Sequence, residues 1–322
     1  MFPIRIASLA IGLAVSVIAQ GAAAQAWPTK PIRLVVPFSA GGANDLMARA
    51  AAEGASKQLG QPVIVDNKPG AGAILGADVV AKSAPDGYTF LVSAAGVVSN
   101  SMIKKSMPYK DDALVPVAMI GLAPSVIVVP ANAPYKDLKE FVAASRKSGG
   151  GFHWATAGTG STPHFVEGIL ETKYGSKLDV VPYKSGSESI TAVLGSQVEA
   201  TSEASIVVLP YVKSGKLKAL AGTWTQRISA YPDLPTAAEE GFPEIRIAHW
   251  AGVHAPRGTP DAILDKMAAA LDAAMKTPAT VERLKGMGIE PIGGTRASFT
   301  KFVDEERARL GGVVKATGMK ED

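Results

Sequence analysis

Near its N-terminus the sequence reads Ile32-Arg33-Leu34-Val35-Val36-Pro37-Phe38-Ser39-Ala40-Gly41-Gly42 and continues as an alanine-rich stretch to Leu59. The β-branched run at 32–36 predicts a strand, and residues 44–59, which Gly60 ends, predict a helix. Between them, two adjacent glycines allow a tight turn. A strand, a glycine loop and a helix in this order are typical of a parallel sheet covered by helices, and they predict an α/β fold.

Strands and helices continue to alternate along the chain. We expect further strands at 63–65, 89–92, 125–129, 152–156, 180–181, 198–200 and 217–221. We expect further helices at 137–147, 163–174, 188–194 and 296–315, and one that starts at Pro260 with Thr259 as its cap. No repeat or low-complexity linker separates these elements, which favours two closely packed lobes over two independent domains.

The composition excludes several classes of protein. Of the 322 residues, 47% are hydrophobic and 19% are charged, so the chain is not disordered and can bury a large core. The formal net charge is +4, without a run of Lys and Arg, and we expect no nucleic-acid partner. Cysteine is absent, which excludes disulfide bonds, cysteine nucleophiles and thiolate metal sites.

Residues 1–26 have the three parts of a secretory signal peptide. Arg5 precedes an apolar stretch at 6–19, and small residues follow at Ala22, Ala24 and Ala26. The apolar stretch is shorter than the roughly 20 residues that a membrane-spanning helix needs, so a retained anchor is the weaker interpretation. We expect cleavage after Ala26 and export of the remaining chain.

The loop that follows the first strand is a candidate anion site. Its glycines let the backbone fold against a ligand, and the first amides of the next helix have no partners within the helix. Such a helix start attracts anions. The alternative is a plain strand-to-helix turn in which Asp45 only complements the helix dipole.

A second candidate loop, Gly158-Thr159-Gly160-Ser161-Thr162-Pro163-His164, also follows an expected strand. It lacks the third glycine of a dinucleotide-binding motif, and the chain contains no phosphate-binding loop of the GxxxxGK[ST] type. Amides and three hydroxyls at a helix start suit a carboxylate or another small anion, with Thr162 as the helix cap. The alternative is a capped turn without a ligand.

Two weaker candidates are the small-residue loops at 93–100 and 183–187, which also follow expected strands. Ligands of open α/β sheets bind beyond the carboxyl ends of the strands, where all four loops are expected. Two loops belong to each expected lobe. A site built from all four would bind a small anion between the lobes and close around it.

An enzymatic alternative rests on short motifs of serine enzymes. Ser101-Met102-Ile103-Lys104 matches S-x-x-K, and three Lys-Ser-Gly triplets match K-[ST]-G. However, S-x-x-K occurs again at 298–301, and the S-D-N element between the two motifs is missing. The four histidines form no metal-binding pair, and His164 suits a hydrogen bond at the helix start better than a catalytic base. We therefore expect neither catalysis nor a metal.

Ordered motifs along almost the whole chain resemble the Bug family, the periplasmic solute receptors of tripartite tricarboxylate transporters. The motifs include Trp27-Pro28-Thr29-Lys30-Pro31, Gly41-Gly42-x-x-Asp45, Asp66-Asn67-Lys68-Pro69-Gly70-Ala71-Gly72, Ala84-Pro85-Asp86-Gly87-Tyr88-Thr89, Gly158-Thr159-Gly160-Ser161-x-x-His164 and Trp250-Ala251-Gly252. This ordered set is far more specific than any one loop.

The resemblance implies a two-lobed flytrap fold, each lobe a mainly parallel sheet flanked by helices, with residues 27–127 plus 248–322 in one lobe and 128–247 in the other. It implies a monomeric periplasmic receptor, without a cofactor, that delivers an organic carboxylate to the membrane subunits of a transporter. The ligand contacts that it implies are Phe38, Ser39, Ala40, Gly41, Gly42, Asn44, Asp45, Ser93, Ala94, Ala95, Gly96, Val97, Gly158, Thr159, Gly160, Ser161, His164, Tyr183, Lys184, Ser185, Ser202 and Glu203.

One departure from the family pattern concerns the ligand. Glu203 stands where the family commonly has an aspartate, and its neighbours at 200–202 are smaller and more polar. If Glu203 reaches the cleft, as its aligned position suggests, its negative charge repels a third negative charge on the ligand, so we expect a dicarboxylate rather than citrate. A secreted hydrolase and a ligand-sensing partner of a membrane signalling protein remain as alternatives.

Overall fold

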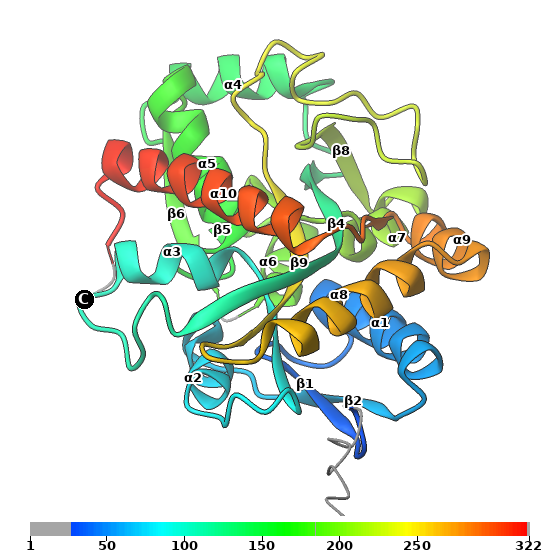
Figure 1. Ribbon diagram of the computed structural model, residues 1–322. Helices are drawn as coiled ribbons and strands as arrows, with labels where there is room; N and C mark the ends of the chain where they lie inside the picture. The colour runs from blue at the N-terminus through cyan, green and yellow to red at the C-terminus, as the bar shows by residue number, and fades with distance from the viewer. Residues whose placement is uncertain (1–26, 184, 321–322) are drawn as a thin grey trace, which may run out of the picture.

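The computed structural model describes residues 27–183 and 185–320 (Figure 1). The expected signal peptide and Lys184 lie outside the described residues. The chain forms a ten-stranded mixed sheet, whose main path has the strand order β2-β1-β3-β9-β4-β7-β5-β6. No helix within the described ranges is long and apolar enough to cross a membrane.

Two groups of parallel strands form the ends of the sheet. β1 (Ile32–Val36) pairs in parallel with β2 (Val63–Asn67) and β3 (Thr89–Ser93). β5 (Phe152–Thr156) pairs in parallel with β6 (Leu178–Pro182) and β7 (Ala200–Ala204). The predicted α/β fold with parallel strands is therefore confirmed, and the expected bounds of β1 and β5 are those observed.

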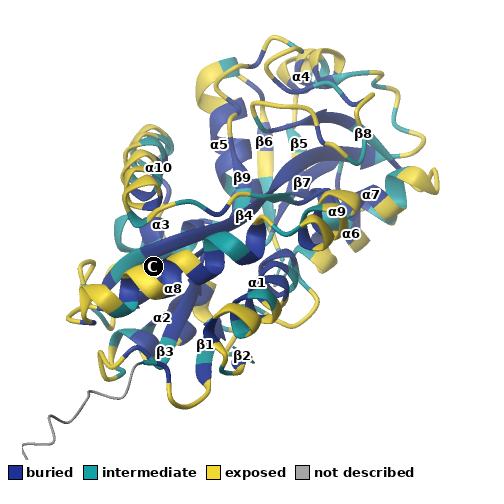
Figure 2. Ribbon diagram, turned by 45° about the vertical axis from the view of Figure 1, so that its right-hand side comes forward, coloured by how far each residue is buried: buried dark blue, intermediate teal, exposed yellow. Residues whose placement is uncertain are grey.

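Two long antiparallel strands join these groups. β4 (Leu114–Pro130) pairs through residues 114–124 with β9 (Ala248–Pro256), and β10 (Glu290–Pro291) lies on its other side. From Ser125 onward, β4 pairs with β7 and with β8 (Leu217–Gly222). β4 therefore runs through both halves of the sheet (Figure 2). The division at residues 127 and 248 stays a prediction.

The expected strand at 125–129 is only the last part of β4. Pro116, Gly121 and Pro124 lie within the strand, and such residues usually indicate a turn or a strand end. The register against β9 shifts near Pro116 and again before Gly121, which accommodates these residues. Gly121 also lets β10 approach, because a Cβ at this position would lie 2.7 Å from the Glu290 carbonyl oxygen.

Most strands are followed by a helix that covers the sheet. The helices are α1 (Ala43–Leu59), α2 (Ile74–Ala81), α3 (Ala95–Ile103), α4 (Leu138–Lys147), α5 (Thr162–Tyr174), α6 (Gly186–Leu194), α7 (Ser205–Lys213), α8 (Asp261–Met275), α9 (Pro278–Gly286) and α10 (Arg296–Thr317), with a 3₁₀ turn at Ala71–Ala73. α10 lies against both α3 and α5, where Gly311 meets Met102 and Gly168 meets Thr317 (Figure 1). The C-terminal helix thus links the two halves.

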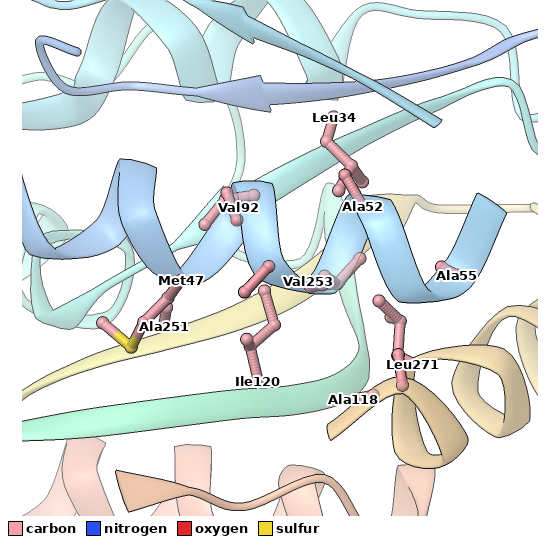
Figure 3. Close-up of a cluster of buried hydrophobic side chains, with 14 of the residues drawn as sticks. Leu34, Met47, Ala52, Ala55, Val92, Ala118, Ile120, Ala251, Val253 and Leu271 are labelled. Atoms are coloured by element: carbon pink, nitrogen blue, oxygen red, sulfur yellow. The ribbon is translucent and has the colours of Figure 1, made fainter. Parts of the chain in front are cut away.

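Small residues allow α1 to pack closely in the first core. A Cβ on Gly54 would lie 2.4 Å from the Ala274 Cβ of α8, so the two helices nearly touch. Met47 and Ala52 of α1 face strand residues such as Ile120 (Figure 3). A larger side chain in such a closely packed contact would destabilise the protein. The packing therefore fixes the position of the α1 N-terminus against the sheet.

Four local expectations were wrong. The expected loop at 93–100 is mostly α3, and the expected strand at 198–200 is β7, which begins only at Ala200 and contains buried polar residues that do not alternate. Ser161, rather than Thr162, precedes α5. Thr259 does not cap α8, because its hydroxyl donates to the Pro256 carbonyl and Pro260 precedes the helix.

Candidate functional site

Residues 249–252 of β9 connect three of the segments expected to hold the ligand. The Asn44 side-chain amide donates to the Trp250 carbonyl oxygen at 2.9 Å, and the Ser93 hydroxyl donates to the Gly252 carbonyl oxygen at 3.0 Å. His249 Nε2 lies 3.9 Å from Glu203 Oε2. One short stretch of β9 therefore fixes the starts of α1 and α3 relative to Glu203.

The loop before α1 is held by the buried carboxylate of Asp45. This carboxylate accepts hydrogen bonds at 2.9 Å from the Gly41 amide, from Arg49 and from Asn67. Burial raises the pKa of Asp45, but these hydrogen bonds outweigh it and bring the pKa below its ordinary value. Asp45 is thus an ionised group that shapes the loop through bonds inside the protein.

The tip of this loop is open to a ligand. Ser39, Ala40 and Gly41 are exposed, and Gly41 has a φ of +83°, which favours glycine. The residue before α1 is Gly42, so no side chain caps the helix. The first amides of α1 therefore remain suited to an anion.

The start of α3 has a neighbour that sequence reasoning missed. Asn100 donates from its side-chain amide to the Gly72 carbonyl oxygen at 2.8 Å, and a Cβ on Gly96 would lie 3.0 Å from the same atom. Ala71 and Ala73 on either side have φ values of +48° and +77°, which are strained for alanine. Gly72 ends one of the motifs that resemble the Bug family, and this motif was the sequence signal that could have indicated the contact.

The loop before α5 turns back on its own helix. Gly158 and Gly160 have φ values of +98° and +74°, and the Gly160 amide donates to His164 Nδ1 at 3.2 Å. Burial lowers the pKa of His164, which keeps the ring neutral with Nδ1 as the acceptor. The Ser161 hydroxyl is buried and has no partner in the described part of the chain.

Thr156 connects this loop to the start of α6. Its carbonyl oxygen accepts from the Tyr183 amide at 2.8 Å and from the Ser189 hydroxyl at 3.0 Å. Ser185 caps α6 by accepting from the Glu188 amide. The loop before α5 therefore lies near Tyr183 and the start of α6, where a Cβ on Gly158 would lie 3.9 Å from the Tyr183 carbonyl oxygen. The expected contact Lys184 lies outside the described residues.

The second pair of loops also approaches α3. A Cβ on Gly160 would lie 2.7 Å from Ile103 Cδ1, so the loop before α5 contacts the end of α3. The structure thus connects the loops expected from both lobes through α3 and β9. Whether each of their residues contacts a ligand stays a prediction.

Glu203 is a buried carboxyl group among uncharged neighbours. It is 4% exposed, and its Oε1 atom has no hydrogen-bond partner among the described residues. Burial raises the pKa of Glu203 to about 8, although a hydrogen bond from the Ala204 amide opposes this shift. Burial lowers the pKa of His249 to about 4. The pair is uncharged overall near pH 7, so the ionised Glu203 assumed from the sequence does not fit its environment.

His249 is a further residue that sequence reasoning missed as part of this site. It precedes the Trp250-Ala251-Gly252 motif, which was the available signal, and its Nε2 atom has no hydrogen-bond partner within the described ranges. The Ser125 hydroxyl on β4 and the Ser202 hydroxyl on β7 are also buried and have no hydrogen-bond partner among the described residues. In the described part of the chain, no serine hydroxyl bonds to a histidine. The site therefore offers hydrogen-bonding groups without an assembled serine–histidine pair.

The chain is similar to known proteins over nearly its full length. BugT of Bordetella pertussis is 35% identical over 318 residues, which cover 98% of each chain. The solved structure of R. palustris Rpa4515 with adipate is 30% identical, covers 91% of this chain and 98% of that one, and has a TM-score of 0.84. MatC from Rhodopseudomonas palustris with bound malate is 31% identical over 89% of this chain and 100% of that one, with a TM-score of 0.79.

A family model agrees with these similarities. The model that describes the tripartite tricarboxylate transporter family receptor matches residues 47–319, which is most of the chain. The relatives confirm the periplasmic-binding-protein fold that the motifs predicted, and nothing among them supports the hydrolase. The chain therefore belongs to the tripartite tricarboxylate transporter receptor family.

Proposed function

We propose that the mature chain binds one small dicarboxylate reversibly and delivers it to the membrane subunits of a tripartite tricarboxylate transporter. The observation that carries this proposal is the connection of the α1 loop, the α3 start and Glu203 to residues 249–252 of β9. Two relatives of about 30% identity, with bound adipate and malate, support a ligand with two carboxylates.

One carboxylate of the ligand lies near residues 39–44 and the other near residues 159–161. The uncapped first turn of α1 supplies amides at one end. The unpartnered Ser161 hydroxyl at the start of α5 supplies a donor at the other. Amides and hydroxyls select a ligand by shape, because their directions are fixed by the loops that carry them.

The two halves close over the ligand as lobes 27–127 plus 248–322 and 128–247. The signal peptide at 1–26 directs the chain to the periplasm, where it acts as a monomer, without a cofactor, and leaves its ligand chemically unchanged. The contact between Gly160 and Ile103 supports closure, because it joins the loop before α5 to the end of α3, which belong to different proposed lobes.

A thermal-shift screen of purified residues 27–322 tests the proposal. Succinate, malate, adipate, terephthalate, benzoate and citrate are compared, followed by mass spectrometry of the acid after incubation. A ligand at 100 times its dissociation constant stabilises the protein by about 2.7 kcal/mol, and we expect this from at least one dicarboxylate, recovered intact. Stabilisation by citrate alone, or conversion of the bound acid, contradicts the proposal.

A further inference from the structure

Glu203 is a buried acid for which the described protein provides no counterion. Its carboxyl group is 4% exposed, and no described Lys or Arg lies within ion-pair distance of it. A buried carboxylate without a positive partner is unfavourable, so the proton is retained. A protonated carboxyl group has an O–H donor that seeks an acceptor.

The elements packed against β7 leave Glu203 with few titratable neighbours. β4 contains none, and His249 of β9 is the neighbour within 4 Å. At the nearby end of α6 stands Gly186, which has no side chain and lies against the carboxyl group. The other titratable residues on the packed elements are His254 on β9, His153 and Tyr183 near β5, His164, Glu167, Glu171, Lys173 and Tyr174 on α5, Glu188 on α6, and Tyr211 and Lys213 on α7.

None of these groups supplies a charge to Glu203. Burial sets its raised pKa, and a backbone hydrogen bond is the opposing contribution. His249 is uncharged near pH 7 because burial lowers its pKa to about 4. His153 forms a hydrogen bond with Glu199 instead, with 3.2 Å between His153 Nδ1 and Glu199 Oε2. The Glu203 carboxyl group therefore has a proton to donate and an Oε1 atom without a partner.

We propose that Glu203, in its protonated form, donates a hydrogen bond to the acceptor end of the bound ligand. This inference rests on the proposed function and specifies its ligand: the far end of the acid is a carboxylate or another acceptor, and not an ammonium group. Glu203 and His249 lie in different proposed lobes, so closure over the ligand buries the carboxyl group and favours its protonated form.

The proposal makes ligand binding depend on pH in one direction. The protonated receptor binds, so affinity falls once Glu203 loses its proton in the free protein. Above the pKa of Glu203 in the free protein, the affinity for the ligand falls by up to tenfold for each pH unit. Adipate stays a dianion above pH 6.5, since ordinary carboxyl pKa values lie near 4, and its own titration does not interfere.

Calorimetric titration of residues 27–322 with adipate at pH 6.5, 8.0 and 9.5 tests the inference. For the wild type, we expect the dissociation constant to rise at least tenfold across this range. For Glu203→Gln, whose amide keeps a donor but does not titrate, we expect a dissociation constant within about threefold of the wild type at pH 6.5 and no change with pH. Glu167→Gln is the matched control, because Glu167 is also buried and its pKa is raised to about 8, and we expect it to keep the wild-type pH dependence.

The possible failures are distinct. If no dicarboxylate binds the wild type at pH 6.5, the proposed function itself fails. If adipate binds the wild type equally at all three pH values, or if Glu203→Gln keeps the pH dependence, Glu203 is not the donor and only this inference fails. A third result also overturns this inference: the Glu203→Gln protein is folded but no longer binds adipate, and the wild type prefers glutamate. This result means that Glu203 is ionised and holds the ammonium group of the ligand.

Discussion

Gly186 lies against the carboxyl group of Glu203, so closely that a Cβ on Gly186 would lie 2.6 Å from Glu203 Oε2. Gly186 is the first residue of α6, and Glu203 belongs to β7. The glutamate side chain at position 203 needs room on the side of α6. The missing side chain of Gly186 provides that room.

This contact predicts the effect of Gly186→Ala. We expect the free energy of unfolding, measured in urea, to fall by about 1–3 kcal/mol, the usual cost of overpacking, and adipate binding to weaken. Adding Glu203→Asp should recover part of the stability, because aspartate is shorter. Gly195→Ala at the other end of α6 is the control, since its Cβ would meet Thr191 at an ordinary 3.4 Å. Equal stability of Gly186→Ala and the wild type speaks against the close contact.

Asp45 gives a second prediction, about the shape of the α1 loop. Asp45→Asn removes the charge that accepts from Arg49, Asn67 and the Gly41 amide, and we expect a loss of about 1–3 kcal/mol of unfolding free energy at pH 7 together with weaker adipate binding. The pKa of Asp45 is lowered in the folded state, so its contribution is present at neutral pH and is lost as the pH falls below about 3.8.

Asp66→Asn is the comparison for this variant. Asp66 makes only long, partly exposed ion pairs of 3.5 Å with Arg33 and Lys68, and we expect its substitution to change stability by less than about 1 kcal/mol. Urea unfolding of both variants, with calorimetric titration of adipate, measures the difference. If the Asp45→Asn protein is as stable as the Asp66→Asn protein, Asp45 is not the group that holds the α1 loop.

The buried carboxyl of Glu203 predicts how stability depends on pH. Its pKa rises from 4.5 to about 8 on folding, so between these values the folded protein retains a proton that the unfolded chain has lost. The free energy of unfolding therefore decreases as the pH rises from about 4.5 to about 8, by up to about 1.4 kcal/mol per pH unit for this group. Urea unfolding from pH 5 to 8 should show a smaller decrease for Glu203→Gln than for the wild type. An equal decrease means that Glu203 is ionised in the folded protein.

Closure of the two halves gives a prediction about the shape of the molecule. A ligand that contacts loops of both proposed lobes favours the closed state, so we expect the radius of gyration from small-angle scattering to fall when adipate saturates the protein. The contact between Gly160 and Ile103 is expected to be absent in the open state. A ligand-free protein that is already open and keeps its radius of gyration at saturation speaks against closure.

Local sequence signals predicted much of the fold. The β-branched runs gave the bounds of β1 and β5, and the glycine at position 60 ends α1 with a φ of +67° as expected. The first part of β4 could not be predicted, because its prolines and glycine are accommodated by register shifts against a strand more than 100 residues away. β7 was misplaced because its buried residues Thr201, Ser202 and Glu203 are polar and show no alternation.

The site was predictable as a set of loops but not as a set of charges. Glycines and hydroxyls after strands indicated the loops, whereas the protonation of Glu203 depends on burial by β4, β9 and α6, which no local pattern reveals. His249 was missed for the same reason, since its neighbour Glu203 is 46 residues away in sequence. Ser93 and Asn44 were expected to contact the ligand. In the structure, their side chains donate hydrogen bonds to carbonyl oxygens of β9.

A crystal structure of residues 27–322 with bound adipate tests the central claim most directly. We predict one adipate molecule, with one carboxylate within hydrogen-bond distance of the first amides of α1 and the other within reach of the Ser161 hydroxyl and the Glu203 carboxyl group. Adipate bound to loops of only one half, or bound away from residues 249–252 of β9, would contradict the account.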